Sequence, residues 1–398
     1  MVEQMRDWVE YKDPTLREKY EGRPIPMSLF FESYLDQKID IRCDLHELMR
    51  KRDLFVNYQL TWSQISFILG KFIPSLLIHS KGIDKKFVCE HYDRGNDFFE
   101  AFLAETMVYT SAFFKSQEDT LEEAQLRKIR YVGEKLQLKP GEKLLDVGCG
   151  WGTLVLETAK NFGVDATGVT LSKNQSEFAA QRIQAAGMEG KARVLTLDYR
   201  DIPQTKYDKI SCLEMAEHVG MKNFQKFLQQ IYSLLDDDGL FYLQIVGLRP
   251  QRLGALDWNE ITSALFMSKY IFPGADASPP LSWVTNQLER ANFEVHTVEN
   301  VNVHYGITIH RWYQNWAKNK DKILAAYGER WFRLWYLFLG WQVLTGEEGR
   351  GGCFQIVCNK QLPKFNRYRY VGENVSLGER AADPSAAQKQ KKIAVGAA

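Results

Sequence analysis

Short apolar runs alternate with amphipathic segments through most of the chain after residue 140. The apolar runs predict strands at 143–147, 165–170, 192–196, 209–214, 239–246, 294–301 and 352–359. Between them, apolar residues recur at helical spacing, for example at 175–186 and at 224–235, and the polar run 236–239 is expected to end the second helix. Strands that alternate with helices indicate an α/β fold, a parallel sheet with helices on both faces. The last two strands are expected to pair like a hairpin.

The same pattern divides the chain into regions. Residues 1–120 are rich in charges, prolines and aromatic residues, with an amphipathic stretch at 54–79, and are predicted to form an N-terminal helical region that covers the active site. Residues 121–361 are predicted to form the main α/β domain, interrupted by lid insertions at about 247–282 and 305–351. The polar tail at 362–398 is expected to be largely disordered.

A glycine-rich turn follows the strand predicted at 143–147. Gly148, Gly150 and Gly152 alternate with larger residues, and Asp146 precedes them. Glycines allow such a turn to adopt unusual φ values and to approach a ligand closely. Asp146 would repel a pyrophosphate but suits a cation, such as the α-amino group of S-adenosylmethionine. The alternative is an ordinary glycine-rich turn of an α/β protein, because such a motif requires structural context.

Ligands of doubly wound sheets bind beyond the carboxyl ends of the strands. At the next two strand ends, Thr170 and Gln175 could bond ribose hydroxyls, and Asp198 could accept a hydrogen bond from an adenine amino group beside the ring of Tyr199. A polar helix N-terminus or an ordinary turn would have the same composition. Seven strands with these polar ends are typical of the Rossmann-like sheet of class I S-adenosylmethionine-dependent methyltransferases.

The fourth strand ends in the best catalytic candidates. Glu214 and Glu217 are three residues apart and are expected to share one face of a turn, with His218 beside them. A carboxyl buried among apolar groups has a raised pKa and can hold or accept a proton. His218 is either a base or a structural residue. No metal is expected, because no partner lies at zinc-ligand spacing.

Composition narrows the classes of function. The net charge of +1 gives no reason to expect a nucleic acid partner, and the six cysteines include no C-x-x-C pair and indicate reduced thiols of an intracellular protein. No signal peptide is recognisable, and no run approaches the roughly 20 apolar residues of a membrane span. Aromatic residues make up 13% of the chain and are concentrated in the two insertions, interleaved with basic residues. These basic residues are Arg311, Lys318, Lys320, Arg330 and Arg333. We interpret the insertions as a lipid-binding lid rather than plain core.

Several motifs together resemble the cyclopropane-fatty-acyl-phospholipid synthase family, and within it the fungal sphingolipid C9-methyltransferases. The first resemblance is carried by the motifs at 109–112, 145–152, 168–172, 198–201, 217–220 and 304–305, and the closer one by 212–220, 272–278 and 327–331. It spans about residues 11–360. The resemblance implies methyl transfer from S-adenosylmethionine to carbon 9 of a sphingoid base, within a ceramide or glucosylceramide, through a carbocation.

The resemblance also implies roles for individual residues. Tyr109 and Thr110 join the expected cofactor-binding residues. Synthases of the wider family hold a bicarbonate as base with a Cys, a Glu, a His and a Tyr; the corresponding residues here are Ser111, Glu217, Gln244 and Tyr305. Two of these four differ from the family, which puts bicarbonate in doubt. Glu217 or His218 is then the alternative base, and the face of Tyr305 is expected to stabilise the cation.

A lipid substrate and peripheral binding to a membrane surface follow from the same resemblance. Fungal relatives generally carry hydrophobic membrane segments upstream of the matched region. We expect association with the cytosolic face of the endoplasmic reticulum and no membrane-spanning segment in this chain; the sequence leaves the oligomeric state open, with a homodimer as one alternative. The rival functions are a cyclopropane synthase acting on unsaturated phospholipid acyl chains, an N-methyltransferase of a phosphobase, and a lipid carrier that binds the cofactor without catalysis.

Overall fold

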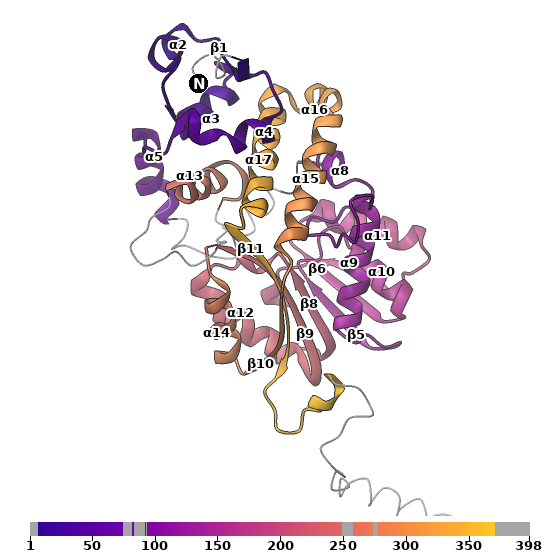
Figure 1. The fold of residues 1–398 in the computed structure, drawn as a ribbon. Helices are drawn as coiled ribbons and strands as arrows, with labels where there is room; N and C mark the ends of the chain where they lie inside the picture. Colours follow the sequence, from indigo (N-terminus) through magenta and orange to yellow (C-terminus); the bar gives the residue numbers. More distant parts are fainter. Residues whose placement is uncertain are drawn as a thin grey trace, which may run out of the picture. The chain divides into compact units, whose positions relative to one another are not determined.

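The computed structural model of the chain describes residues 7–74, 82, 92, 94–248, 258–273 and 278–370. Residues 1–360 form one compact unit and residues 361–398 a second, of which the 3-10 helix Arg367–Tyr370 is described. A seven-stranded sheet lies at the centre of the first unit (Figure 1). Its strands are β5 (Lys143–Val147), β6 (Asp165–Thr170), β7 (Ala192–Thr196), β8 (Tyr207–Leu213), β9 (Leu235–Leu248), β10 (Phe293–Asn300) and β11 (Gly351–Lys360).

The strand order is β10-β11-β9-β8-β5-β6-β7. Strands β5 to β9 pair in parallel, and β11 pairs antiparallel with both β9 and β10. All seven predicted strands are present. The last two pair antiparallel, as a hairpin would, but three helices connect them. Strand β9 begins at Leu235 rather than 239, because Leu235 pairs with Tyr207 across an irregular register. The polar run 236–239 therefore lies within a strand.

Helices cover both faces of this sheet (Figure 1). Helices α9 (Leu121–Lys135), α10 (Thr153–Phe162) and α11 (Lys173–Ala185) lie on one face, and α12 (Met221–Leu234) and α14 (Leu281–Arg290) on the other. Each carries an apolar stripe toward the strands; in α12 this stripe is formed by Phe224, Phe227, Leu228, Ile231 and Leu234. The helices predicted at 175–186 and 224–235 are confirmed, with ends shifted by a few residues.

The N-terminal region is not purely helical. Helices α2 (Pro14–Tyr20), α3 (Met27–Leu35), α4 (Leu45–Arg50), α5 (Trp62–Phe67) and α8 (Asn96–Leu103) alternate with short strands. These strands form two small sheets, β1 (Val9–Tyr11) with β3 (Ile39–Ile41), and β2 (Ile25–Pro26) with β4 (Val56–Asn57). The amphipathic stretch predicted at 54–79 contains β4, α5 and the π-helix η2 (Ile68–Phe72), and its residues 75–79 lie outside the described part.

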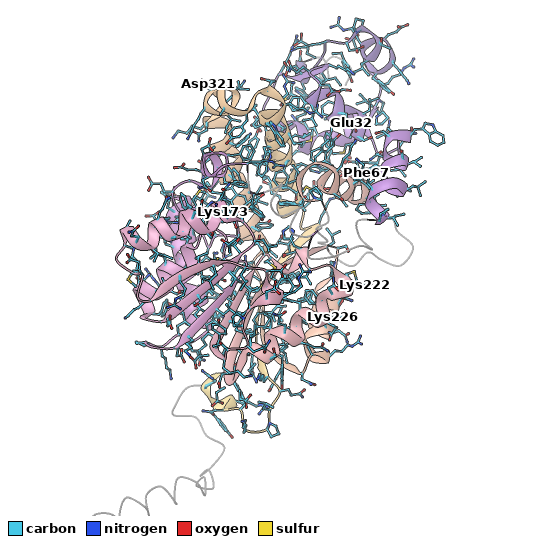
Figure 2. All side chains as sticks on the ribbon, turned by 180° about the vertical axis from the view of Figure 1, so that it is seen from behind. Glu32, Phe67, Lys173, Lys222, Lys226 and Asp321 are labelled. Atoms are coloured by element: carbon cyan, nitrogen blue, oxygen red, sulfur yellow. The ribbon has the colours of Figure 1, made fainter. Side chains whose placement is uncertain are left out.

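The two insertions supply helices that pack against this region. The first contains α13 (Trp258–Phe266) and the π-helix η5 (Met267–Ile271), and the second contains α15 (Asn302–Lys318), α16 (Lys320–Tyr327) and α17 (Glu329–Glu347). Figure 2 shows Phe67 on α5 and Glu32 on α3, in the same part of the molecule as α13. Lys269 of η5 forms an ion pair with Glu32.

Most aromatic residues of the second insertion belong to the core. Trp312, Trp316, Trp335 and Trp341 are buried and share one hydrophobic cluster with α3, α4 and α8. Arg333, one of the basic residues interleaved with these aromatic residues, is also buried; it pairs with Glu329 and donates to the carbonyl oxygens of Tyr34 and Ile39. The plain-core alternative is therefore correct for Trp316, Trp335 and Arg333.

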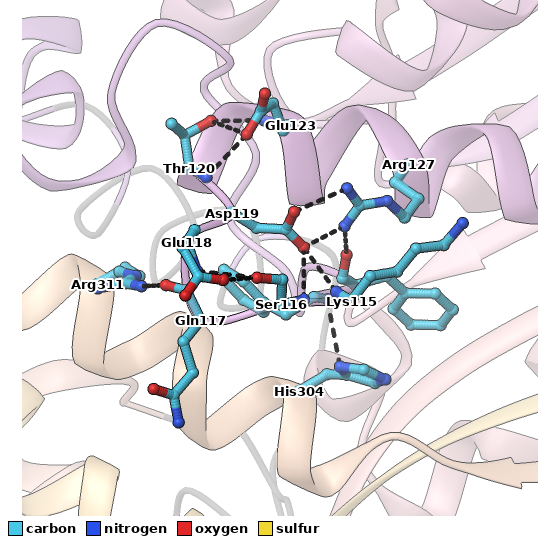
Figure 3. Close-up of polar contacts among 12 residues, drawn as sticks. Lys115, Ser116, Gln117, Glu118, Asp119, Thr120, Glu123, Arg127, His304 and Arg311 are labelled. Atoms are coloured by element: carbon cyan, nitrogen blue, oxygen red, sulfur yellow. Dashed lines mark hydrogen bonds and ion pairs between the residues drawn. The ribbon is translucent and has the colours of Figure 1, made fainter.

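The loop at 115–119 connects helix α15 of the second insertion to helix α9, which covers the sheet (Figure 3). Asp119 pairs with Arg127 of α9 at 2.6 Å, and Arg311 of α15 donates to the carbonyl oxygen of Gln117 at 2.7 Å. The preceding segment is held by α15 as well, since Ala112 N donates to Thr308 Oγ1 at 2.9 Å. These contacts hold Ser111 beside the carboxyl end of β8. No helix in the described residues is long and apolar enough to cross a membrane.

Candidate functional site

The glycine turn connects β5 to α10, and all three of its glycines have a positive φ: +79° at Gly148, +53° at Gly150 and +74° at Gly152. A Cβ atom on Gly148 would lie 2.4 Å from Cγ of Met215, and one on Gly152 would lie 2.7 Å from Cβ of Ala179. A Cβ atom on Gly150 would meet nothing within 4 Å. Two glycines therefore permit close packing, and the third leaves the turn open to a ligand.

Two small cavities of about 100 and 80 Å³ lie around this turn, at the carboxyl ends of the parallel strands. Both are lined by Gly148, Gly150, Gln175, Tyr92 and Glu214. This is the place at which doubly wound sheets bind their ligands.

The structure brings most of the predicted cofactor residues to these cavities. Thr170 and Tyr199 line the first, and Tyr109, Thr110 and Asp146 line the second. Gly152 and Asp198 line neither.

The polar candidates also bond one another. The Asp198 carboxylate pairs with Arg200 at 2.7 Å, so it is Arg200 that reaches the cavity wall. Thr170 Oγ1 donates to Gln175 Oε1 at 2.6 Å, which fixes both side chains on the wall.

The electrostatics at the end of β5 suit a cation. Asp146 is buried and accepts a hydrogen bond from Ser211 Oγ at 2.7 Å. Burial raises the pKa of Asp146 to about 6, although Ser211 and Lys128 act in the opposite direction. A cationic group of a ligand would favour the ionised carboxylate.

A larger cavity of about 290 Å³ opens beside the two small ones. It shares Tyr92, Glu214 and His218 with the first small cavity and Tyr92, Tyr109 and Glu214 with the second. Its walls come from both insertions and from strands β9 and β11, and are mostly apolar. The apolar side chains in its lining include Phe72, Met267, Phe272, Ile309, Trp312, Phe338, Leu339 and Trp341. A mostly apolar cavity of this kind suits a hydrocarbon chain, and it meets the smaller cavities at a few polar residues.

Glu217 and Tyr305 lie in the wall of the larger cavity. Glu217 Oε1 accepts a hydrogen bond from Val246 N at 2.6 Å, and Oε2 is buried with no hydrogen-bond partner among the described residues. Burial, together with the charge of Glu214, raises the pKa of Glu217 to about 8. Burial also raises the pKa of Tyr305, whose phenol is neutral at physiological pH.

Ser111 and Gln244 lie behind the cavity wall, fully buried, and both donate to Oε1 of Glu214. The Ser111 donor is its backbone N–H, at 3.0 Å, and the Gln244 donor is its side-chain amide. Ser111 Oγ donates to the carbonyl oxygen of Ala112. The donors that would be needed to hold a bicarbonate are thus already used by a carboxylate, which would repel a second anion. These residues do not fit bicarbonate.

Sequence reasoning missed several residues of the site. Lys128, Arg200 and Met215 line the small cavities. Lys128 comes from a helix with no recognisable motif, whereas Arg200 and Met215 lie within the motifs at 198–201 and 212–220, where only their neighbours were selected. Tyr92 lines all three cavities. It stands in a sequence stretch, 91–99, that is rich in polar and aromatic residues, and this composition could have indicated a site.

Comparisons with known proteins agree with this geometry. The model of the mycolic acid cyclopropane synthetase family matches residues 79–355. A sphingolipid C9-methyltransferase of Komagataella phaffii is 42% identical over 382 residues, covering 93% of this chain and 77% of that protein. Sphingolipid C9-methyltransferase A of Emericella nidulans is 43% identical, covering 91% and 70%. A probable fatty acid methyltransferase of Pseudomonas putida is 33% identical, covering 72% of each chain.

Solved structures of cyclopropane synthases are also similar to this chain. A cyclopropane synthase from Mycobacterium tuberculosis superposes with a TM-score of 0.67 at 27% identity, covering 69% of this chain and 98% of that one. A mycolic acid cyclopropane synthase complexed with SAH and CTAB superposes with a TM-score of 0.66 at 29% identity, with the same coverage. The predicted fold, that of S-adenosylmethionine-dependent methyltransferases, is confirmed.

Proposed function

Because this chain belongs to the mycolic acid cyclopropane synthetase family, we propose that it methylates carbon 9 of the sphingoid base of a ceramide or glucosylceramide. It is an S-adenosylmethionine-dependent methyltransferase. One observation supports the lipid substrate most strongly: the apolar cavity of about 290 Å³ meets the cavities around the glycine turn at Glu214.

The residues around the glycine turn would hold the cofactor. Asp146 would attract its α-amino group, Thr170 and Gln175 would bond its ribose, and Tyr199 would lie beside its adenine. When bound, S-adenosylmethionine supplies an electrophilic methyl group. We propose that the walls of the larger cavity position the alkene of the lipid against that group and exclude water.

Methylation of the alkene at carbon 9 leaves a carbocation at the neighbouring carbon. Tyr305 and Trp312 line this cavity, and their aromatic rings would stabilise this charge. Loss of the proton from the methylated carbon restores the double bond and gives a branched alkene, whereas loss of a proton from the new methyl group would close a cyclopropane. The choice between these products depends on where the base is placed.

The experiment that tests this function uses the purified chain and S-adenosylmethionine labelled with carbon-13 in its methyl group. We offer it a panel of ceramides, glucosylceramides and unsaturated phospholipids and identify the product by NMR. A vinylic methyl signal from a sphingolipid is expected. Upfield ring protons from a phospholipid would instead establish the cyclopropane synthase, which the comparisons do not favour.

We further propose that the chain binds a membrane surface through α5 and η2, at the cytosolic face of the endoplasmic reticulum. Trp62 is 85% exposed and Leu69 is 67% exposed, and Ile73 follows on the same helix. Phe72 of η2 lines the larger cavity. The helix that leads into the cavity therefore presents apolar side chains to solvent, which is typical of interfacial anchors.

The double variant Trp62→Ser with Leu69→Ser is expected to bind phosphatidylcholine vesicles at least about tenfold more weakly. Each large apolar side chain that leaves water contributes about 1.5–3 kcal/mol, and about 1.4 kcal/mol is a tenfold change in binding. Co-sedimentation with vesicles measures this effect. Met221→Ser removes an exposed apolar side chain from α12 and is the matched control. Equal vesicle binding by the double variant and wild type would contradict the proposal.

A further inference from the structure

Glu214 has an unusual backbone and an unusual position. It follows the last residue of β8 with a φ of +53°, in the left-handed region that few residues other than glycine adopt. Its backbone N–H donates to the carbonyl oxygen of Gln244 at 2.8 Å, and this bond holds Glu214 beside strand β9 at the carboxyl end of β8. It is also a residue whose side chain lines all three cavities of the site. Strained residues held in this way often have a functional reason.

The side-chain hydrogen bonds of Glu214 are made by one of its two carboxylate oxygens. Ser111 N, Gln244 Nε2 and Cys353 Sγ all donate to Oε1, and among the described residues no donor is assigned to Oε2. Glu214 is half-buried and lines the three cavities. Oε2 is therefore the oxygen available to a substrate.

The Gln244 amide is itself oriented by its neighbour across the sheet. Gln355 of β11 pairs with Gln244 of β9 in the register, and Gln355 Nε2 donates to Gln244 Oε1 at 2.8 Å. Because the oxygen of the Gln244 amide is occupied, its nitrogen is turned toward Glu214. This network supplies donors to a carboxylate and would not suit a protonated carboxyl at Oε1.

We propose that Glu214 is the general base of this reaction and takes the place of the bicarbonate that related synthases hold. The proposal rests on the proposed function and identifies the group that completes it. The C–H bond at the methylated carbon breaks, its electron pair forms the new double bond with the neighbouring cation, and the proton moves to Oε2 of Glu214. The proton then leaves to solvent when the products depart.

Charges around the two carboxyls support this assignment over Glu217. Burial raises the pKa of Glu214 above its usual value, and three hydrogen bonds together with the nearby charge of Lys128 offset only part of this rise. The Glu217 carboxyl accepts a hydrogen bond from Val246 N and lines the larger cavity but neither of the small ones. Glu214 borders both the cofactor side and the lipid side, where the methyl group and the alkene must meet. A base at that junction is adjacent to the carbon that loses the proton.

The first experiment uses the wild-type chain and needs no variant. Turnover of the sphingolipid is measured in buffer freed of carbon dioxide and again with added bicarbonate. Equal rates are expected, because the base is part of the chain. A rate that falls without bicarbonate and recovers with it would overturn the proposal, while turnover itself would still establish the proposed function.

The second experiment compares two substitutions at the same position. Glu214→Gln and Glu214→Gly are each expected to lower kcat by at least about 10²-fold, the usual contribution of a general base. Glycine adopts a φ of +53° without strain, so the Gly variant is expected to fold. It also frees Ser111 N and Gln244 for a small anion, and formate or bicarbonate is expected to restore its kcat at least about tenfold. The Gln variant fills the space and is expected to show no rescue.

Cofactor binding is measured for both variants by calorimetry, and rates are compared at saturating S-adenosylmethionine. A merely structural role for Glu214 would give loss without rescue in the Gly variant, and would overturn the proposal. Rescue of Glu217→Gly by the same anions, with none for Glu214→Gly, would assign the base to Glu217 instead.

Discussion

Glu217→Gln is expected to lower kcat by about 10²–10³-fold and to leave the Kd for S-adenosylmethionine within about twofold of the wild-type value. Glutamine keeps the shape of the side chain and can accept the hydrogen bond from Val246 N, but it cannot carry a negative charge. A carboxylate in a dry cavity stabilises a developing cation strongly, and loss of one such preorganised group typically has an effect of this size. Glu217 lies outside the two small cavities, so cofactor binding is spared.

The pH dependence tests the same assignment. The pKa of Glu217 is about 8 in the empty cavity, and a bound cation shifts it downward because it favours the carboxylate. The ionised fraction increases with pH, so the wild-type kcat is expected to rise below about pH 8 and then to level off, and the variant is expected to lack this rise. Glu134→Gln, at an exposed position on α9, serves as the control. A Glu217→Gln variant with more than a tenth of the wild-type kcat would refute the role of the charge.

Gly148→Ala is expected to weaken the binding of S-adenosylmethionine by at least about 10²-fold, a loss of about 2.7 kcal/mol. The added Cβ atom would lie 2.4 Å from Cγ and 2.5 Å from Cβ of Met215, so the turn or the segment after β8 must move. Residue 148 and Met215 both line the cofactor cavity, and their displacement changes its walls. Calorimetric titration with S-adenosylmethionine measures the effect.

Gly141→Ala separates this effect from backbone strain. Gly141 has a φ of +83°, close to the +79° of Gly148, but a Cβ atom there meets nothing within 4 Å. Both variants place alanine in the left-handed region and are expected to lose about 1–2 kcal/mol of the free energy of unfolding. Only Gly148→Ala is expected to lose cofactor binding. Equal Kd values for the two variants would show that the close contact with Met215 is unimportant.

The sheet could be predicted from the sequence because each of its strands has its own apolar signal. Strands β5, β6 and β7 begin and end at the predicted residues, since glycines or polar residues flank buried runs. The start of β9 could not be predicted in this way. Leu235 joins the sheet only because Tyr207 of β8 is its partner, and pairing across an irregular register leaves no local pattern.

The aromatic insertions show a second limit. A sequence indicates that Trp316 and Trp335 need an apolar environment, but it does not indicate which surface provides that environment. The environment comes from α8, since Phe98 lies 5.0 Å from Trp316 and 5.1 Å from Trp335 between ring centroids. Contacts between residues more than 200 positions apart have no periodic signal.

The sequence predicted many residues of the candidate site but not the hydrogen bonds between them. Ser111 and Gln244 stand at two of the four positions that hold an anion in the wider family, and the structure places both beside one carboxylate. That carboxylate is Glu214, which we had expected to act as a neighbour of Glu217 on one face of a turn. Its positive φ instead accompanies hydrogen bonds from Ser111 N and Gln244 Nε2. Residue spacing in a sequence does not predict a positive φ at a glutamate.

The shared hydrophobic cluster of α3, α4, α8, α15 and α17 has a consequence for protein engineering. These helices form one packed unit rather than a separate lid. The unit is built from residues before 104 and from the second insertion. A chimera that imports the C-terminal insertions of another family member without its first hundred residues would juxtapose mismatched ring surfaces. Transplanting chain-length preference between such enzymes therefore requires both segments to travel together.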